Sequence, residues 1–216
     1  MKTKPDIPAT DVKRPGRPSV DRREEILEVA QRLYEAIGFE KTTIGDVARE
    51  LGMSPANLYR SFPNRQAIDE AIAGRKLAII EDRAWSEARA TRDAGAALEA
   101  LSRVVLEETL RLMFSNQRMH QLCAIAAREK WPVVDAYLDG LRGAVRHIIM
   151  EGQRTGAFAK ADPEEMADTV CAALTRIWHP HMVEVFRAED LAVTSDRICR
   201  LLVRGLRGEG GDRNEL

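Results

Sequence analysis

The chain has few of the residues and patterns that mark several large functional classes. Aromatic side chains make up 5% of its 216 residues, and no apolar run approaches the roughly 18 residues of a membrane-spanning helix. Residues 1–18 lack the apolar stretch of a secretory signal. The cysteines lie far apart, with no metal-ligand spacing, at Cys123, Cys171 and Cys199. We therefore expect a cytoplasmic protein with reduced thiols and no membrane partner.

Catalytic and metal-binding signatures are also missing from the sequence. It has no glycine-rich phosphate loop, no G-x-S-x-G and no H-E-x-x-H. His120 and Cys123 share a helical face, but two ligands do not complete a zinc site. The same holds for His179 and His181, which the helix-ending Pro180 separates. We predict that the chain is not an enzyme and has neither a cofactor nor a metal site.

The composition is that of a helical protein. Alanine, leucine, glutamate and arginine dominate, and 44% of the residues are hydrophobic, enough for a substantial core. Residues 1–76 hold 14 Lys+Arg against 12 Asp+Glu, a net of +2, whereas the remainder holds 19 against 22, a net of −3. Because this asymmetry is weak, binding to nucleic acid must depend on where the basic residues lie.

The segment of residues 42–65 is the most informative in the chain. Thr43 is a suitable N-cap, and the positions after it give one apolar helical face, formed by Ile44, Val47, Ala48 and Leu51. Gly52 can take the left-handed conformation that ends a helix. Ser54 and Pro55 then suit the N-cap and first position of a second helix. The pattern predicts two short helices joined by a tight turn, a helix-turn-helix.

The second helix would present its first residues to the major groove of DNA. Asn57 suits a bidentate pair with adenine, whereas Tyr59 and Arg65 suit phosphate oxygens. Leu58 and Phe62 are four apart and should face inward. The outward-facing positions are Ser54, Pro55, Ala56, Asn57, Tyr59, Arg60 and Ser61. For any one of these, a solvated surface position is the better interpretation, but the whole capped pattern favours DNA binding.

Residues 22–72 resemble the DNA-binding domain of the TetR family of transcriptional regulators. The match is carried by Ile26, Leu27, Ala30, Gly38, Phe39, Thr42, Thr43, Ile44, Val47, Ala48, Gly52, Met53, Ser54, Leu58, Tyr59, Phe62 and Arg65. Ser61 and Pro63 depart from the family pattern, where His and Gly or Lys are common. We add Thr42 and Thr43 to the predicted DNA contacts.

The resemblance implies an all-α fold of about nine helices. Residues 22–68 would form the helix-turn-helix domain, residues 69–209 the effector-binding and dimerisation domain, and residues 210–216 a disordered tail. Amphipathic segments agree with this division, at about 66–89, 94–114, 116–130, 132–155, 163–179 and 195–207. An irregular stretch is expected at 179–193. The segment from residue 66 would reach into both domains and act as the lever between them.

A basic arm, residues 1–21, precedes the motif. It contains four of the nine prolines, lacks helical periodicity and is expected to be disordered in the free protein. Arg14 and Arg17 belong to a Lys-Arg-Pro-Gly-Arg-Pro stretch similar to the core of an AT-hook, which enters the minor groove of A·T-rich DNA. A generic basic tail is an equally good interpretation, and either would strengthen binding.

The resemblance further implies a ligand site and a dimer. Candidate pocket residues, each of which would otherwise fill a core, are Met113, Phe114, Met119, His120, Cys123, Trp131, Tyr137, Leu141, His147 and Trp178. In the family the last two helices pair with those of a second subunit. The apolar positions assigned to that interface here are Val170, Leu174, Ile198, Leu201 and Leu202.

These patterns predict a homodimer that binds a palindromic operator in double-stranded DNA and represses transcription until a small hydrophobic or amphipathic effector enters. Repression rather than activation is implied by the resemblance alone. Two alternatives stay open. One is a DNA-binding protein without an effector, which a dry, fully packed interior would favour. The other is a cytoplasmic helical enzyme with an accidental helix-turn-helix resemblance, whose activity would survive Asn57→Ala.

Overall fold

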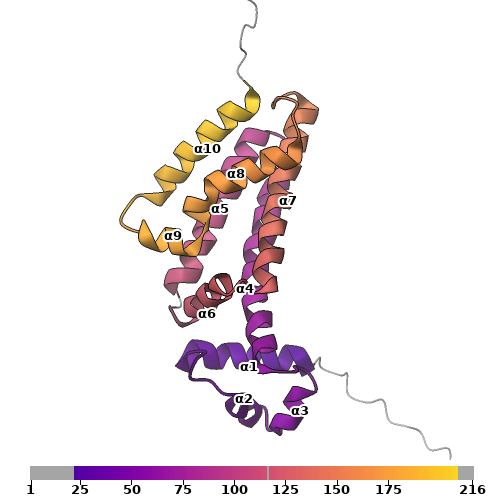
Figure 1. The fold of residues 1–216 in the computed structure, drawn as a ribbon, viewed down its shortest axis with the longest axis vertical. Helices are drawn as coiled ribbons and strands as arrows, with labels where there is room; N and C mark the ends of the chain where they lie inside the picture. The colour runs from indigo at the N-terminus through magenta and orange to yellow at the C-terminus, as the bar shows by residue number, and fades with distance from the viewer. Residues whose placement is uncertain (1–21, 116, 209–216) are drawn as a thin grey trace, which may run out of the picture.

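The computed structural model describes residues 22–115 and 117–208, which form ten α-helices and no strand. In chain order (Figure 1) they are α1 (Arg22–Ile37), α2 (Ile44–Glu50), α3 (Pro55–Tyr59), α4 (Arg65–Ala90), α5 (Ala94–Ser115), α6 (Gln117–Arg128), α7 (Pro132–Thr155), α8 (Pro163–Trp178), α9 (Pro180–Val185) and α10 (Leu191–Arg207). The predicted arm, with Arg14 and Arg17, and the predicted tail lie outside the described residues. No helix of the described part is both long and apolar enough to cross a lipid bilayer.

The all-α prediction is confirmed, but the described chain has one helix more than the nine expected. α9 occupies the stretch predicted to be irregular. Pro180 begins it, and the His179 ring caps it by accepting a hydrogen bond from the His181 N–H at 3.2 Å. α10 also begins earlier than predicted, because the Asp190 carboxylate caps its first turn. A capping side chain sets the start of each helix, so the spacing of apolar residues did not predict where either begins.

The helix-turn-helix end of the molecule has its own hydrophobic core. α1, α2 and α3 pack there with the first turns of α4, and form the lower group of helices in Figure 1. The predicted inward orientation of Leu58 and Phe62 is confirmed, since both are 0% exposed. Other buried members of this core are Ile26, Ala30, Tyr34, Ile68 and Ile72.

A second, larger core lies at the opposite end and is enclosed by α4, α5, α7, α8 and α10. α4, with 26 residues, runs from one core to the other (Figure 1). Its Ile72 is buried in the first core, whereas Ile80 and Ala84 are buried in the second. One continuous helix therefore belongs to both parts of the molecule.

α6 is shared by the two parts in a different way. Its residues Met119, Leu122 and Ala126 are buried in the same core as α1, α2 and α3. The sequence analysis had assigned this segment wholly to the effector-binding domain. The helix-turn-helix therefore packs against a helix that follows it by some 50 residues or more in the chain.

Gly152 allows the closest approach between two segments of the larger core. It lies in α7, and the ring of Phe158 folds back against it after the helix ends. A methyl group added at Gly152 would come within 2.3 Å of that ring. Because Phe158 is only 3% exposed, its ring has no free space into which to move.

Gly152→Ala is expected to lower the free energy of unfolding by about 1–3 kcal/mol, the usual cost of overpacking. Gly45→Ala is the matched control, because its methyl would meet only the Thr43 hydroxyl at an ordinary 3.5 Å. Alanine also favours the helical conformation there. Urea unfolding of the two variants measures the difference. An unchanged midpoint for Gly152→Ala would contradict the packing described.

Candidate DNA-binding surface and ligand pocket

The turn between α2 and α3 is built from hydrogen bonds that a glycine makes possible. Gly52 has a φ of 63°, in the left-handed region, and its N–H donates to the Arg49 carbonyl. The next N–H, of Met53, donates to the Ala48 carbonyl at 2.9 Å, which completes a Schellman motif. At the other end of α2, the predicted N-cap Thr43 forms a capping box. Both ends of this short helix are therefore fixed by local contacts.

α3 is held from behind and at both ends. The Ser54 hydroxyl accepts a hydrogen bond from the Asn57 N–H at 3.4 Å, as predicted for its N-cap. Arg23 of α1 places its guanidinium 4.2 Å from the centroid of the buried Phe62 ring and donates to the Ser61 carbonyl. These contacts position α3 from its inner side, so its outer side and first turn are left to solvent.

Most of the predicted DNA contacts lie on that outer side. The exposed residues are Ser54, Pro55, Ala56, Asn57, Tyr59 and Arg60. Tyr59 is 48% exposed, so about half of its side chain faces solvent. The described residues offer the Asn57 amide and the Tyr59 hydroxyl no hydrogen-bond partner. Both groups are therefore available to a molecule outside the chain.

Thr42 and Thr43 have different positions from those expected. Thr42 is 1% exposed, and its hydroxyl donates to the Gly38 carbonyl at 2.8 Å. Its assignment as a DNA contact is wrong, because the side chain ties together the loop between α1 and α2. Thr43 is exposed, but its hydroxyl lies 2.7 Å from the Asp46 carboxylate within the capping box. Thr43 stays a predicted contact, with its hydroxyl already engaged.

Arg65 is also used inside the protein. Its guanidinium donates to the Phe39 carbonyl and lies 3.4 Å from the Asp69 carboxylate, which accepts from the Tyr34 hydroxyl at 2.5 Å. Burial raises the pKa of Asp69, against the opposing effects of Tyr34 and Arg65. The side chain joins the start of α4 to the loop after α1, and its phosphate contact stays a prediction, with the guanidinium already engaged.

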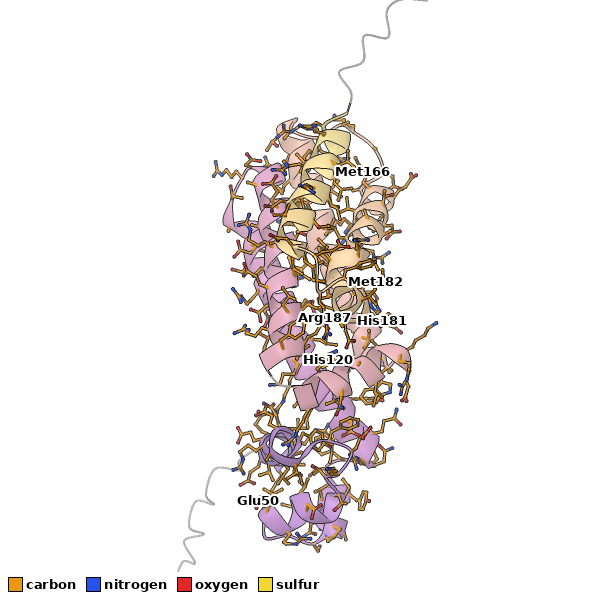
Figure 2. The ribbon with its side chains drawn as sticks, turned by 90° about the vertical axis from the view of Figure 1, so that its left-hand side faces the viewer. Glu50, His120, Met166, His181, Met182 and Arg187 are labelled. Carbon is orange, nitrogen blue, oxygen red and sulfur yellow. The ribbon has the colours of Figure 1, made fainter. Side chains whose placement is uncertain are left out.

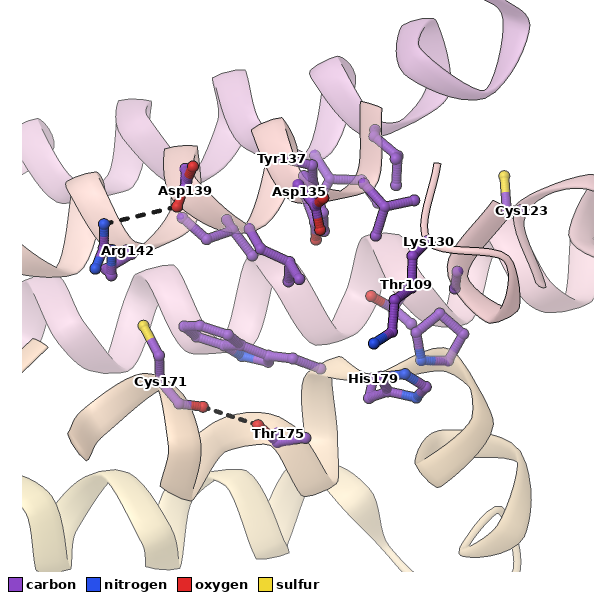
Figure 3. A pocket seen from close by; sticks show the side chains of 18 of the residues that line it. Thr109, Cys123, Lys130, Asp135, Tyr137, Asp139, Arg142, Cys171, Thr175 and His179 are labelled. Carbon is purple, nitrogen blue, oxygen red and sulfur yellow. Dashed lines mark hydrogen bonds and ion pairs between the residues drawn. The ribbon is translucent and has the colours of Figure 1, made fainter. Parts of the chain in front are cut away.

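A cavity of about 590 Å³ lies among α4, α5, α6, α7 and α8. This volume is within the range of about 300–1,000 Å³ that is usual for small-molecule sites. Its wall is mainly apolar and includes Leu77, Ile80, Leu112, Val134, Leu138 and Leu141. Figure 3 shows this space from close by, with α8 facing α7 across it. All of its lining residues fall within residues 69–209, the predicted effector-binding and dimerisation domain.

Only part of the predicted pocket lines this cavity, namely Cys123, Tyr137, Leu141 and Trp178. Three other candidates fill cores: Met113 lies in the larger one, and Met119 and Trp131 lie in that of the helix-turn-helix. Phe114 is 56% exposed. These assignments are corrected, since none of the four side chains faces the cavity.

The two remaining candidates are histidines. His120 lies half-buried on α6 near the level where the two cores meet (Figure 2), and it does not line the cavity. The His147 ring packs 5.8 Å from the Trp85 ring and lines a second, smaller cavity of about 220 Å³ near the start of α5. Both assignments to the effector pocket are therefore corrected.

Several polar groups around the cavity were missed by the sequence analysis. They are Thr109, Lys130, Asp135, Asp139, Arg142, Thr175 and His179 (Figure 3). Asp135, Asp139 and Arg142 recur at i, i+4 and i+7 on α7, so a polar stripe was available as a signal. Lys130 and His179 lie at helix ends, where periodicity gives no information.

Four titratable groups of the cavity wall are held neutral mainly by burial: two thiols, one phenol and one imidazole. Burial raises the pKa of Cys123 to about 12, and burial together with a nearby aspartate raises that of Cys171 to about 11. Both thiols therefore act as apolar surface. Burial and a nearby glutamate also raise the pKa of Tyr137. The pKa of His179 is lowered by burial and by His181, which favours the neutral imidazole.

α6 connects the cavity with the helix-turn-helix core. Cys123 and Ala127 line the cavity, whereas the neighbouring face of the helix is buried against α1 and α4. At the start of α6, Arg118 donates to the carbonyls of Glu35 at 3.2 Å and of Ala36, both in the last turn of α1. α1 has no basic residue in its own last turn, so α6 supplies the charge that these carbonyls favour.

The predicted dimer residues fall into two groups. Val170 and Leu174 are 1% and 0% exposed within the single chain, so their assignment to a subunit interface is wrong. Leu201 on α10 is 71% exposed, and Ile198 and Leu202 beside it are half-buried. These three stay predicted interface residues, because α10 presents them on its outer side.

Arg65→Gln is expected to change the stability of the protein, and Arg60→Gln to change its binding to DNA. The first should lower the free energy of unfolding by about 1–3 kcal/mol, because it leaves a buried carboxylate without its cation. The second should leave stability unchanged and make the slope of log K against log[salt] shallower by about 1.8, because the bound dimer loses one phosphate contact from each subunit. Urea unfolding and DNA binding at several salt concentrations measure both. A stable Arg65→Gln with a shallower salt slope would assign Arg65 to a phosphate contact and contradict the structural role.

Comparisons with known proteins agree with this geometry. The family model described as "Bacterial regulatory proteins, tetR family" matches residues 26–72, and the model described as "Tetracyclin repressor-like, C-terminal domain" matches residues 94–199. The nucleoid occlusion factor SlmA of Vibrio campbellii is 36% identical over 76 residues, 31% of this chain and 39% of that protein. SlmA of Vibrio cholerae is 31% identical over 103 residues, 47% and 50% respectively. The chain thus spans half or less of these relatives.

Solved structures extend the likeness along the chain. FadR of Thermus thermophilus, a TetR-family repressor in complex with lauroyl-CoA, has a TM-score of 0.62 and 20% identity, and the match covers 90% of this chain and 100% of that one. RolR in complex with resorcinol has a TM-score of 0.58 and 14% identity, with 85% and 86% covered. Identities this low show the fold alone. With both family models matched in order on the fold they describe, the chain belongs to the TetR family of transcriptional regulators.

Proposed function

We propose that the chain is a ligand-responsive repressor that binds a palindromic operator as a homodimer in the cytoplasm. A small apolar or amphipathic effector would enter the cavity and release the protein from DNA. The observation that carries this proposal is the position of α6. One face of that helix lines the cavity, and the next face is buried in the core on which α3 rests.

The DNA side of the proposal rests on the exposed first turns of α3. Asn57 would pair with an adenine, and Tyr59 and Arg60 would meet phosphate oxygens. One such short helix reads too few base pairs to be selective. A two-fold pair reads two half-sites about 34–36 Å apart, so the dimer is part of the function. The exposed Leu201 on α10 supports a second copy at that face.

The coupling would run through α6 and α4 together. A ligand that displaces α6 from the cavity side also displaces the buried Met119 and Leu122 and the Arg118 cap on α1. α4 carries Leu77 and Ile80 on the cavity wall and begins beside α3. A coupling of about 1–3 kcal/mol, roughly 5–150-fold in affinity, is typical of allostery and is enough to relieve repression.

An organic effector is supported by the cavity and by structural relatives. The solved relatives named above hold lauroyl-CoA and resorcinol, which are very different in size. The wall of the present cavity is mostly apolar and its volume of about 590 Å³ suits a small organic molecule. The proposal therefore extends to an apolar or amphipathic effector and leaves its identity to experiment.

A DNA-binding protein without an effector is the second candidate, favoured by the name of the curated relatives, nucleoid occlusion factor. One experiment distinguishes the two candidate functions. Compounds that raise the melting temperature of the free chain are added to its complex with DNA from its own promoter region. A ligand-responsive repressor loses affinity for that DNA, whereas the second candidate does not.

Asn57→Ala is expected to lose about 1–3 kcal/mol of discrimination at one base pair of each half-site, because a bidentate contact to a base edge is removed. Tyr59→Phe should weaken binding to every sequence to a similar extent, since a phosphate contact carries no sequence information. Competition binding with single-base operator variants measures both effects. A loss confined to one operator position in Tyr59→Phe would contradict the phosphate role.

Arg118→Gln is expected to reduce the effect of a pocket-binding compound on operator affinity at least severalfold while the compound still binds, because the polar link between α6 and α1 is lost. Arg128→Gln is the matched control on the same helix, since among the described residues Arg128 pairs only with the adjacent Glu129, at 3.5 Å. Operator affinity is measured with and without a compound from the thermal-shift screen. An unchanged ratio in Arg118→Gln would remove α1 from the coupling route.

A further inference from the structure

The cavity contains a buried donor with no acceptor. Trp178 is 8% exposed, and its indole N–H has no hydrogen-bond partner among the described residues. It is the sole buried side-chain donor or acceptor left in this condition in that part of the chain. A buried N–H without an acceptor destabilises a protein, so such groups are rare unless a bound molecule completes them. The same side chain lines the cavity.

A second unusual residue lines the same cavity. Lys130 has a φ of 54° and is the one non-glycine residue of the described chain in the left-handed region. The N–H groups of Lys130 and Trp131 donate to the carbonyls of Ala127 and Ala126, so Lys130 occupies the position after α6 where glycine is strongly preferred. Strain of this kind persists only where the surrounding structure enforces it, and it clusters at functional sites.

The Lys130 ammonium has no carboxylate within 4.0 Å among the described residues. Figure 3 shows its side chain extending from the junction of α6 and α7 toward the end of α8, where His179 lies. The His179 Nδ1 atom accepts a hydrogen bond from the His181 N–H, so the proton of its neutral ring is on Nε2. The cavity lining therefore carries two donors on this side, the Lys130 ammonium and the His179 ring, and a third, the Trp178 indole N–H, is buried within its wall.

The acidic residues that line the cavity both lie on α7. The Asp139 carboxylate lies 3.6 Å from the Arg142 guanidinium, which also contacts Asp168 at 3.2 Å (Figure 3 shows the first pair). Asp135 is exposed and faces the same space from α7. The formal charges of the lining side chains cancel, two cations against two carboxylates. Selectivity must therefore come from the position of the unpaired donors and not from total charge.

We propose that the effector is an apolar molecule with one carboxylate, bound by the Lys130 ammonium and the Trp178 indole N–H. The apolar body would lie against Leu77, Ile80 and Leu141. This inference rests on the proposed effector function and specifies the chemical class of the effector. It also explains why a lysine stands at a backbone position that favours glycine.

The test uses the full chain and three probes with one apolar body and different headgroups: 4-phenylbutanoate, 4-phenylbutanamide and 4-phenylbutylamine. Decyl compounds with the same three headgroups serve as a second set. Calorimetry measures affinity, and operator binding is followed with each probe present. The carboxylate is expected to bind about tenfold more tightly than the amide, which lacks the charge, and the amine should bind least.

Variants identify the two donors. Lys130→Gln should weaken carboxylate binding about tenfold and change amide binding less than twofold. Trp178→Phe should weaken both, since both carry a carbonyl oxygen. Lys130→Gly should weaken carboxylate binding and yet raise the midpoint of urea unfolding, because glycine relieves the backbone strain. If Lys130 had only a structural role, Lys130→Gly would not weaken carboxylate binding while raising the midpoint of urea unfolding. Asp135→Asn is the control on the same wall and should bind the carboxylate at least as tightly as wild type.

The outcomes separate the two claims. Equal or tighter binding of the amide or the amine, with release of operator DNA, overturns the carboxylate class and leaves the effector function standing. Unchanged carboxylate affinity in Lys130→Gln and Trp178→Phe also overturns it. If no probe of either set binds or affects operator affinity, the effector function fails and the inference fails with it.

Discussion

Close packing around α6 is the constraint on which the behaviour of this protein depends. Met119, Leu122 and Ala126 are each at most 1% exposed, buried with the helix-turn-helix, and the next face of the same helix borders a cavity. Protein interiors are packed as densely as organic crystals, so a helix in this position cannot move at the cavity without a response in the core. α4 also connects these two regions, because different parts of its length lie in each. α6 connects them across its width, with one face on the cavity and the next in the core.

Polar contacts also join the helices at the helix-turn-helix end of the molecule. Arg118 caps α1 from α6, and Arg65 holds the start of α4 to the loop after α1 through the Phe39 carbonyl. Each joins two segments through a hydrogen bond from a guanidinium to a backbone carbonyl. Arg23 of α1 holds the end of α3 in the same way, through the Ser61 carbonyl and the Phe62 ring.

Local chemistry was predictable from the sequence, and long-range partners were not. Thr43, Gly52 and Ser54 act on groups within a few residues, so their roles in caps and turns could be predicted. Arg65 finds its acceptor 26 residues earlier in the chain, and a basic residue beside a DNA-binding motif looks the same whether it meets phosphate or a carbonyl. In the same way, an apolar residue such as Met119 does not reveal which core it fills, and Lys130 at a helix end carries no periodic signal.

The cavity wall contains two locally unfavourable features that the proposed effector would relieve or exploit. An unpaired buried N–H and a left-handed non-glycine residue each destabilise a chain by about 1–3 kcal/mol. That magnitude equals a typical allosteric coupling. A ligand shifts a conformational equilibrium only by its difference in affinity for the two states. Contacts to groups that are unsatisfied in one state supply such a difference, whereas contacts to a fully paired wall do not. Under the proposed function, the groups that destabilise the fold at Trp178 and Lys130 would therefore be the ones through which it responds to an effector.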